Sequence, residues 1–256
     1  MRSPLFTLLL PVLLISGWEV AAHVIANPFV LPSLTTVVPI LLHPFSPAYT
    51  LGSGSLIDNA LTSLYRVAIG FLLAALVAIP LGIGMGRSRF MQDFLDSTIE
   101  LLRPIPPLAW VPLALAWFKI GLASITFIIL IGAFFPILLN TIDGVKSVKK
   151  TWVEVAETLG ARERNVLLKV ILPGSAPTIW TGLRVGFGIA WMCLVAAEWL
   201  PGTTRGLGYL ILHAYNFGQT NLIIAGMVVI GVIGILIDQV FRAGERKWFS
   251  WRALER

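Results

Sequence analysis

Arg103 is a charged residue inside a long apolar stretch, and Glu100 lies three residues before it. Because a charge is costly to bury in a membrane, such residues commonly line the path of a substrate or ion. Arg103 would then help an anion to pass. The alternative is a neutralised structural pair of Glu100 and Arg103 near the inner membrane surface, with the arginine reaching out to the interface. The sequence leaves both interpretations open.

Arg103 also begins a proline-rich run, Arg103-Pro104-Ile105-Pro106-Pro107, that interrupts this apolar stretch. Each proline lacks an N–H donor and clashes with the carbonyl four residues before it. Broken helix is tolerated in a membrane only where protein or a water-filled cavity surrounds it. We therefore expect the run at a pore or at a contact between subunits. The alternative is a helix that ends early near the membrane surface.

Glu198 ends another apolar stretch, just before Trp199. It could gate an outer mouth or contact an external partner, but a solvated charge at a helix end is the favoured interpretation. The three histidines are widely separated and lack the spacing of metal ligands. Cys193 is the single cysteine, so an intrachain disulfide is excluded. We expect no metal site and no catalytic residue on this chain.

The composition identifies the environment that positions these residues. Of 256 residues, 57% are hydrophobic and only 12% are charged, whereas about 25% are charged in a typical soluble domain. Too few polar side chains exist to cover a water-soluble globule. The net charge of +6 comes from basic residues placed between apolar runs, not from one stripe. This distribution favours a membrane protein over a nucleic-acid-binding protein.

A membrane-spanning helix needs about 20 mostly apolar residues. Six stretches qualify, and we predict an all-α polytopic membrane protein of about six transmembrane helices: Leu5–Ala26, Arg66–Gly86, Phe94–Lys119, Leu122–Asp143, Thr178–Leu200 and Asn221–Phe241. The first stretch could instead be a cleaved signal peptide, but no clean cleavage site follows it. We expect it to be retained as an anchor, and we treat residues 1–256 as a single membrane domain.

Most lysines and arginines fall on one side of this arrangement, near Arg2 and in the segments Arg87–Arg89, Lys146–Lys169 and Arg242–Arg256. Basic residues gather in cytoplasmic loops. We therefore predict that both termini are cytoplasmic.

Residues 144–177 form the only long cytoplasmic connection in this arrangement. Trp152, Val155 or Ala156, and Leu159 recur at helical spacing and mark one apolar face. We predict that Thr151 caps this helix and that Gly160 ends it in a left-handed conformation. A second helix should run from about Arg162 to Leu172 and stop at Pro173.

A short amphipathic helix below the membrane has two possible roles. It can lie on the lipid surface, or it can dock its apolar face into a groove on a cytosolic partner. Periodicity alone favours the lipid surface. Acidic residues such as Glu154, Glu157 and Glu163 argue against attachment to anionic lipid.

This loop resembles the EAA motif of ABC importer permeases, E-A-A-x3-G-x9-I-x-L-P. The matching residues are Glu154-Val155-Ala156, Gly160 and Val170-Ile171-Leu172-Pro173. Val155 and Val170 depart from the consensus but keep the helix faces apolar. The resemblance implies the type I ABC importer permease fold and assigns contact with an ATPase to residues in and beside the motif: Glu154, Val155, Ala156, Leu159, Gly160, Val170, Leu172 and Pro173.

Further segments resemble the subgroup that imports nitrate, taurine, alkanesulfonates, bicarbonate and some vitamin precursors. They are Leu102–Leu113, Gly132–Thr141, Val195–Glu198 and Gly206–Ile211. The resemblance implies a homodimer in the inner membrane, two cytosolic ATPases, an external substrate-binding protein and a small solute such as an oxyanion. Candidates for the path of this solute are Glu100, Arg103, Pro104, Pro106, Pro107 and Glu198.

No G-x-x-x-x-G-K-[ST] phosphate loop is present. We therefore expect no cofactor on this chain, with ATP and Mg bound by the partner ATPase. Two rival functions remain. A stand-alone secondary carrier or channel would transport without an ATPase, although buried carboxylates for a proton relay are scarce. A membrane enzyme would need paired catalytic groups in the spans, and none is evident.

Overall fold

The computed structural model describes residues 4–249, and within them every regular element is a helix. This confirms the all-α prediction. Arg2, Arg252 and Arg256, which contributed to the predicted orientation, lie outside the described residues.

The chain forms two compact units, Met1–Ser63 with Thr203–Val232, and Leu64–Gly202 with Ile233–Arg256. The long helices α3 (Leu56–Arg87) and α11 (Thr220–Trp248) each contribute residues to both units. The prediction of a single permease domain over residues 1–256 stays a prediction.

The first unit contains α1 (Pro4–Ile25), α2 (Leu34–Leu42), the short η1 (Pro47–Tyr49), the start of α3, α10 (Leu207–Asn216) and the start of α11. The glycine-serine run at residues 52–55 is held in place by hydrogen bonds. Ser53 and Ser55 are buried, and the Asn59 amide donates to both of their carbonyls. The side-chain oxygen of Asn59 also accepts the N–H of Gly206 at 2.8 Å, just before α10.

The second unit contains the helices around the predicted pore and loop. They are the rest of α3 and α11, α4 (Arg89–Leu102), η2 (Pro107–Trp110), α5 (Val111–Phe118), α6 (Leu122–Lys146), α7 (Lys150–Thr158), α8 (Glu163–Val166), the π turn η3 (Leu167–Ile171) and α9 (Leu172–Ala197).

Four stretches among the described residues are long and apolar enough to cross a membrane: Leu56–Arg87, Leu122–Lys146, Glu163–Ala197 and Thr220–Trp248. The predicted span Phe94–Lys119, which the proline-rich run was expected to interrupt, corresponds to two helices, Arg89–Leu102 and Pro107–Phe118, with a bend of 88° between them. The first predicted span lies in α1, whose apolar part Leu9–Ile25 is shorter than these four.

In the second unit, α3 packs against α6 through a row of small residues at every fourth position: Gly70, Ala74, Ala78, Gly82 and Gly86. A Cβ atom at Gly82 would lie 2.7 Å from the Cβ of Thr141 and 3.0 Å from the Leu138 carbonyl oxygen. Small residues in a row spaced by four let two helix backbones approach closely.

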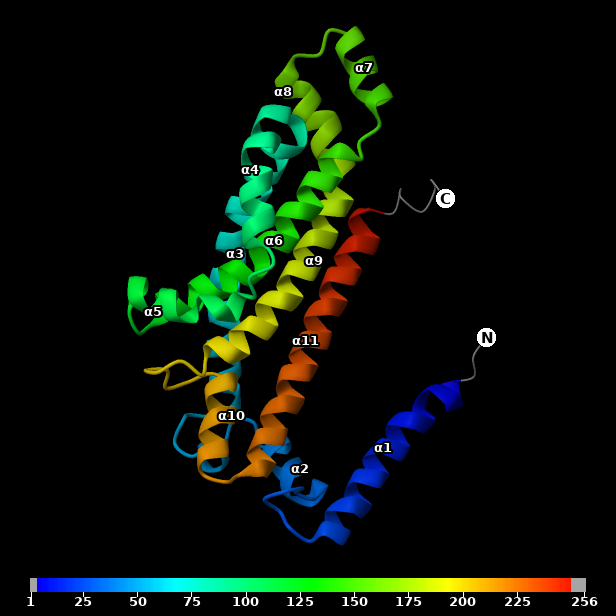
Figure 1. Ribbon diagram of the computed structural model, residues 1–256. Helices are drawn as coiled ribbons and strands as arrows, with labels where there is room; N and C mark the ends of the chain where they lie inside the picture. Colours follow the sequence, from blue (N-terminus) through cyan, green and yellow to red (C-terminus); the bar gives the residue numbers. More distant parts are fainter. Residues whose placement is uncertain (1–3, 250–256) are drawn as a thin grey trace. The chain divides into compact units, whose positions relative to one another are not determined.

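Helix α9 lies side by side with α6 in Figure 1 and makes a second close contact with it. Gly182 lies against Asn140, and Gly186 lies against Ile137 and the Ala133 carbonyl. Helix α6 is therefore contacted by small residues from both α3 and α9, which explains why so much of it is buried.

Candidate functional site

Helix α7 carries the first half of the predicted contact segment. It begins at Lys150, with Lys149 at the N-cap and no capping hydrogen bond from a side chain. The prediction that Thr151 caps it is wrong, because Thr151 is already inside the first helical turn. Gly160 confirms its predicted role: its φ is 78°, Gly160 N–H donates to the Glu157 carbonyl, and Ala161 N–H donates to the Ala156 carbonyl. This is the Schellman pattern at a helix C-terminus.

The second half of the segment continues directly into a membrane helix. Helix α8 passes through the π turn at Leu167–Ile171 into α9 without a break, giving one 35-residue stretch, Glu163–Ala197. The prediction that Pro173 stops the helix is wrong. Pro173 lies in the first turn of α9, after a wider turn in which hydrogen bonds reach five residues back. We attribute the tolerance of its ring to this altered pairing.

The two apolar sides of α7 have different surroundings. Val153 and Ala156 pack with Ala161 against the core formed by Val145, Val166 and Ile171. Trp152, Val155 and Leu159 are instead 43%, 54% and 82% exposed. The predicted choice between Val155 and Ala156 is therefore resolved in favour of Val155. We call Trp152, Val155 and Leu159 the outer stripe. Figure 1 shows α7 beside α8, beyond the ends of α6 and α9.

The remaining motif residues surround the base of α7. Glu154 is exposed and lines a small hollow of about 210 Å³ together with Arg87, Lys150 and Val153. Val170 lies half-buried in the π turn, and Leu172 and Pro173 begin α9. Arg87, at the end of α3, also contacts Glu163 of α8 at 3.5 Å. The two halves of the motif therefore rest on one apolar core.

The proline-rich run lies beside a cavity in the second unit. This cavity measures about 640 Å³ and is lined by residues of the run, of α6 and of α9: Arg103, Ile105, Pro107, Ile131, Gly132, Phe135, Pro136, Leu139, Asn140, Asp143, Val185 and Ile189. The prediction that these prolines break the helix is confirmed. Helix α4 ends at Leu102 and η2 begins at Pro107. Pro104 and Pro106 are exposed but do not line the cavity.

The predicted pairing of Glu100 with Arg103 is not formed among residues 4–249. Glu100 is exposed and does not line the cavity. Arg103 is the C-cap of α4 and lines the cavity. The cavity is also lined by Asn140 and Asp143, which were not among the predicted residues of the solute path. A signal for them was available: Gly132, Pro136, Asn140 and Asp143 recur at helical spacing on one face of α6.

The prediction that Glu198 is solvated is wrong. Its side chain is fully buried, and its Oε1 lies 2.8 Å from Nη1 of Arg66 on α3. Arg66 and Glu198 both lie at the ends of predicted spans on the same side of the membrane. The sequence therefore predicted similar membrane depths for them, but it gave no sign that they form a pair.

A second ion-pair group links α9 with α11. Nε of Arg184 lies 2.6 Å from Oδ1 of Asp238, and Nε of Arg242 lies 2.8 Å from Oδ2 of the same aspartate. Gly182 and Gly186, on either side of Arg184, pack closely against α6, and nothing in the sequence indicated the aspartate that pairs with Arg184.

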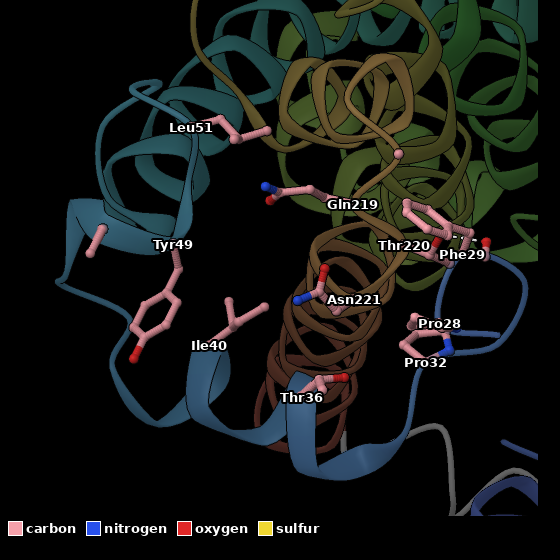
Figure 2. Close-up of a pocket in the computed structure, with 12 residues that line it drawn as sticks. Pro28, Phe29, Pro32, Thr36, Ile40, Tyr49, Leu51, Gln219, Thr220 and Asn221 are labelled. Atoms are coloured by element: carbon pink, nitrogen blue, oxygen red, sulfur yellow. Dashed lines mark hydrogen bonds between the residues drawn. The ribbon is translucent and has the colours of Figure 1, made fainter. Parts of the chain in front are cut away.

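The first unit has a cavity of about 350 Å³ between α2, the η1 region and the start of α11. Figure 2 shows Asn221 pointing toward Ile40, while Thr220 donates a hydrogen bond to the Phe29 carbonyl at 2.7 Å. No charged residue is part of its lining. This cavity therefore offers no counterpart to Arg103.

Comparison with known proteins identifies the family. The family model for the binding-protein-dependent transport system inner membrane component matches residues 70–249. A putative ABC transporter permease protein of Methanocaldococcus jannaschii is 56% identical over 96% of this chain and 91% of its own length. The taurine transport system permease protein TauC of Escherichia coli is 40% identical over 94% of this chain and 87% of its own. The nitrate import permease protein NrtB of a Synechocystis strain is 39% identical over 80% and 74%.

The fold is also known. An inward-facing structure of the MetNI methionine ABC transporter matches with a TM-score of 0.58 and 15% identity, covering 73% of this chain and 95% of that one. This all-helical fold with several membrane spans agrees with the family match. The chain therefore belongs to the inner membrane components of binding-protein-dependent transport systems, and it is an ABC importer permease.

Proposed function

We propose that two copies of this chain form the membrane part of an importer for a small solute that carries an acidic oxyanion group. Two cytosolic ATPases bind ATP and Mg and drive the cycle, and an external binding protein delivers the solute. Both termini lie on the cytoplasmic side. Relatives named for taurine, aliphatic sulfonates and nitrate support this solute class.

The observation that carries the proposal is the outer stripe of α7. Trp152, Val155 and Leu159 are exposed on a short helix whose other side is fixed to the core. An exposed apolar helix face of this kind suits a groove on a partner protein. Because the core also holds α8, and α8 continues into α9, movement of the docked partner reaches the membrane helices directly.

The proposed solute path passes through the cavity beside Arg103. Its guanidinium attracts an oxyanion, and the broken helix at Pro104–Pro107 exposes the cavity lining. Arg103→Gln should therefore reduce import while leaving the ATPases attached.

The docking surface is tested with Leu159→Glu, because a charge on the outer stripe opposes burial in an apolar groove. We expect the ATPases to be lost from the purified complex and ATP-driven uptake in proteoliposomes to stop. Glu157→Gln, a conservative change at an exposed position on the same helix, is the matched control and should keep both. Full ATPase stoichiometry with normal uptake in Leu159→Glu would contradict the proposal. Uptake driven by an ion gradient without ATPases would support a secondary carrier instead.

A further inference from the structure

The cavity beside Arg103 contains two opposite charges. Arg103, at the end of α4, and Asp143, on α6, are its only charged lining residues. No hydrogen bond or ion pair of either side chain is present within residues 4–249. Both charges are therefore available to a ligand.

Two other arginines on the membrane helices of this unit have carboxylate partners. Arg66 is paired with Glu198, and Arg184 is paired with Asp238. Charged groups on membrane helices commonly pair with one another, and those that face a cavity mark a path for ions or substrates. The available charges of Arg103 and Asp143 thus distinguish the cavity from the paired sites.

Asn140 adds a directional acceptor near Asp143. Its amide nitrogen donates to the Pro136 carbonyl at 2.8 Å, within the same helix. This bond fixes the amide and leaves its Oδ1 to accept a hydrogen bond from the cavity. The cavity lining thus offers a cationic donor on Arg103, and α6 offers an anionic acceptor and a neutral one.

The presence of one positive and one negative side chain in the same cavity decides which solute fits. A simple anion would be attracted by Arg103 but repelled by Asp143, and a simple cation would meet the reverse. A neutral solute would leave both charges without partners. A dipolar solute satisfies both, and a volume of about 640 Å³ is within the size of small-molecule sites.

Resting on the proposed function, we propose that this cavity takes a dipolar solute, whose acidic oxyanion group lies on Arg103 and whose ammonium group lies on Asp143 and Asn140. Amino-sulfonates and amino acids with separated charges have this chemistry. Inorganic oxyanions and amine-free sulfonates do not.

The test is equilibrium binding of radiolabelled probes to the purified permease–ATPase complex without binding protein. Two matched pairs are used: taurine against ethanesulfonate, and β-alanine against propionate. Within each pair the chain length is the same and only the ammonium group differs, so the pairs also tell a sulfonate from a carboxylate. The wild-type complex should prefer the dipolar member of at least one pair.

Asp143→Asn should weaken binding of the preferred dipolar probe by about tenfold, as expected when a charged hydrogen-bond partner is lost. Binding of its amine-free partner should be unchanged or tighter. Asp93→Asn, at an exposed acidic position on α4 outside the cavity lining, should behave as wild type. Co-purification of the ATPases shows that each variant is folded and assembled.

Equal binding within both pairs, no binding of any probe, or a preference that persists in Asp143→Asn would overturn the inference. These outcomes are separate from failure of the proposed function, which is measured as ATP-driven import of the solute that the native binding protein carries. If ATP-driven import is measured but the dipolar probes bind no more tightly than their amine-free partners, only the inference about the cavity is wrong and the proposed function stands.

Discussion

The carboxylate of Glu198 is fully buried, and Arg66 lies 2.8 Å from it. Removing one member of a buried ion pair leaves an uncompensated charge, and this costs more than replacing both. The pair therefore makes stability depend on two residues that are 132 positions apart.

We expect Glu198→Gln to lower the free energy of unfolding by about 3 kcal/mol. Replacing both residues with apolar ones, Arg66→Met with Glu198→Leu, should recover much of this loss because no buried charge remains. Thermal unfolding of the purified protein in detergent measures both effects, and Asp93→Asn is the exposed control. A midpoint for Glu198→Gln equal to that of wild type would show that the pair does not stabilise the fold.

Local residue patterns were predicted well, whereas distant pairing was not. The role of Gly160 depends on a few neighbouring residues, so the sequence was sufficient to predict its left-handed conformation. The burial of Glu198 and the partner of Arg184 depend on contacts between helices that are remote in the chain. The same holds for Asp143, whose place in the cavity requires the arrangement of α4, α6 and α9.

At the scale of helices, the small residues of α3 determine how closely it approaches α6. Gly82 has no room for a side chain, whereas a Cβ atom at Gly231 on α11 would meet nothing within 4 Å. The same substitution should therefore have opposite effects at the two sites.

Gly82→Ala forces a methyl group against Thr141 and should destabilise the protein by about 2 kcal/mol. Gly231→Ala meets no obstacle and should be neutral or stabilising by up to about 1 kcal/mol, because alanine favours helix. Unfolding by heat or denaturant in detergent compares the two variants. A Gly82→Ala variant as stable as Gly231→Ala and wild type would show that α3 does not pack closely against α6.

The positions of helices that depend on apolar composition were predicted correctly. Features that depend on backbone geometry, such as bends and π turns, were not. Apolar length was sufficient to find most spans. The prolines after Arg103 were correctly predicted to break the helix, but the bend of 88° was not. Pro173 was wrongly predicted to stop a helix, because the sequence shows the missing N–H and not the π turn that precedes it.

At the scale of the whole molecule, the distribution of lysine and arginine predicts which loops face the cytoplasm. The segment before α3 should be external, and the loop that contains α7 should be internal. This orientation decides whether the outer stripe can reach a cytosolic ATPase at all.

Labelling with a membrane-impermeant maleimide measures this orientation. Cys193 is the single cysteine and is buried, so Cys193→Ala provides a suitable background. In that background, Ala48→Cys should be labelled in right-side-out vesicles and Arg164→Cys only in inverted ones. Both positions are exposed. The reverse pattern would place α7 outside the cell and exclude its proposed contact with an ATPase.

The unbroken helical stretch Glu163–Ala197 has a mechanical consequence. With 35 residues, it is roughly 50 Å long at 1.5 Å per residue. One end adjoins the core beneath α7, the other ends beside Glu198, and Gly182 and Gly186 press against α6 in between. Such a rod, pivoting where it touches α6, swings its two tips in opposite directions. Movement of the tip beside α7 would then displace the buried carboxylate in the opposite direction, and the Arg66 contact would oppose that motion.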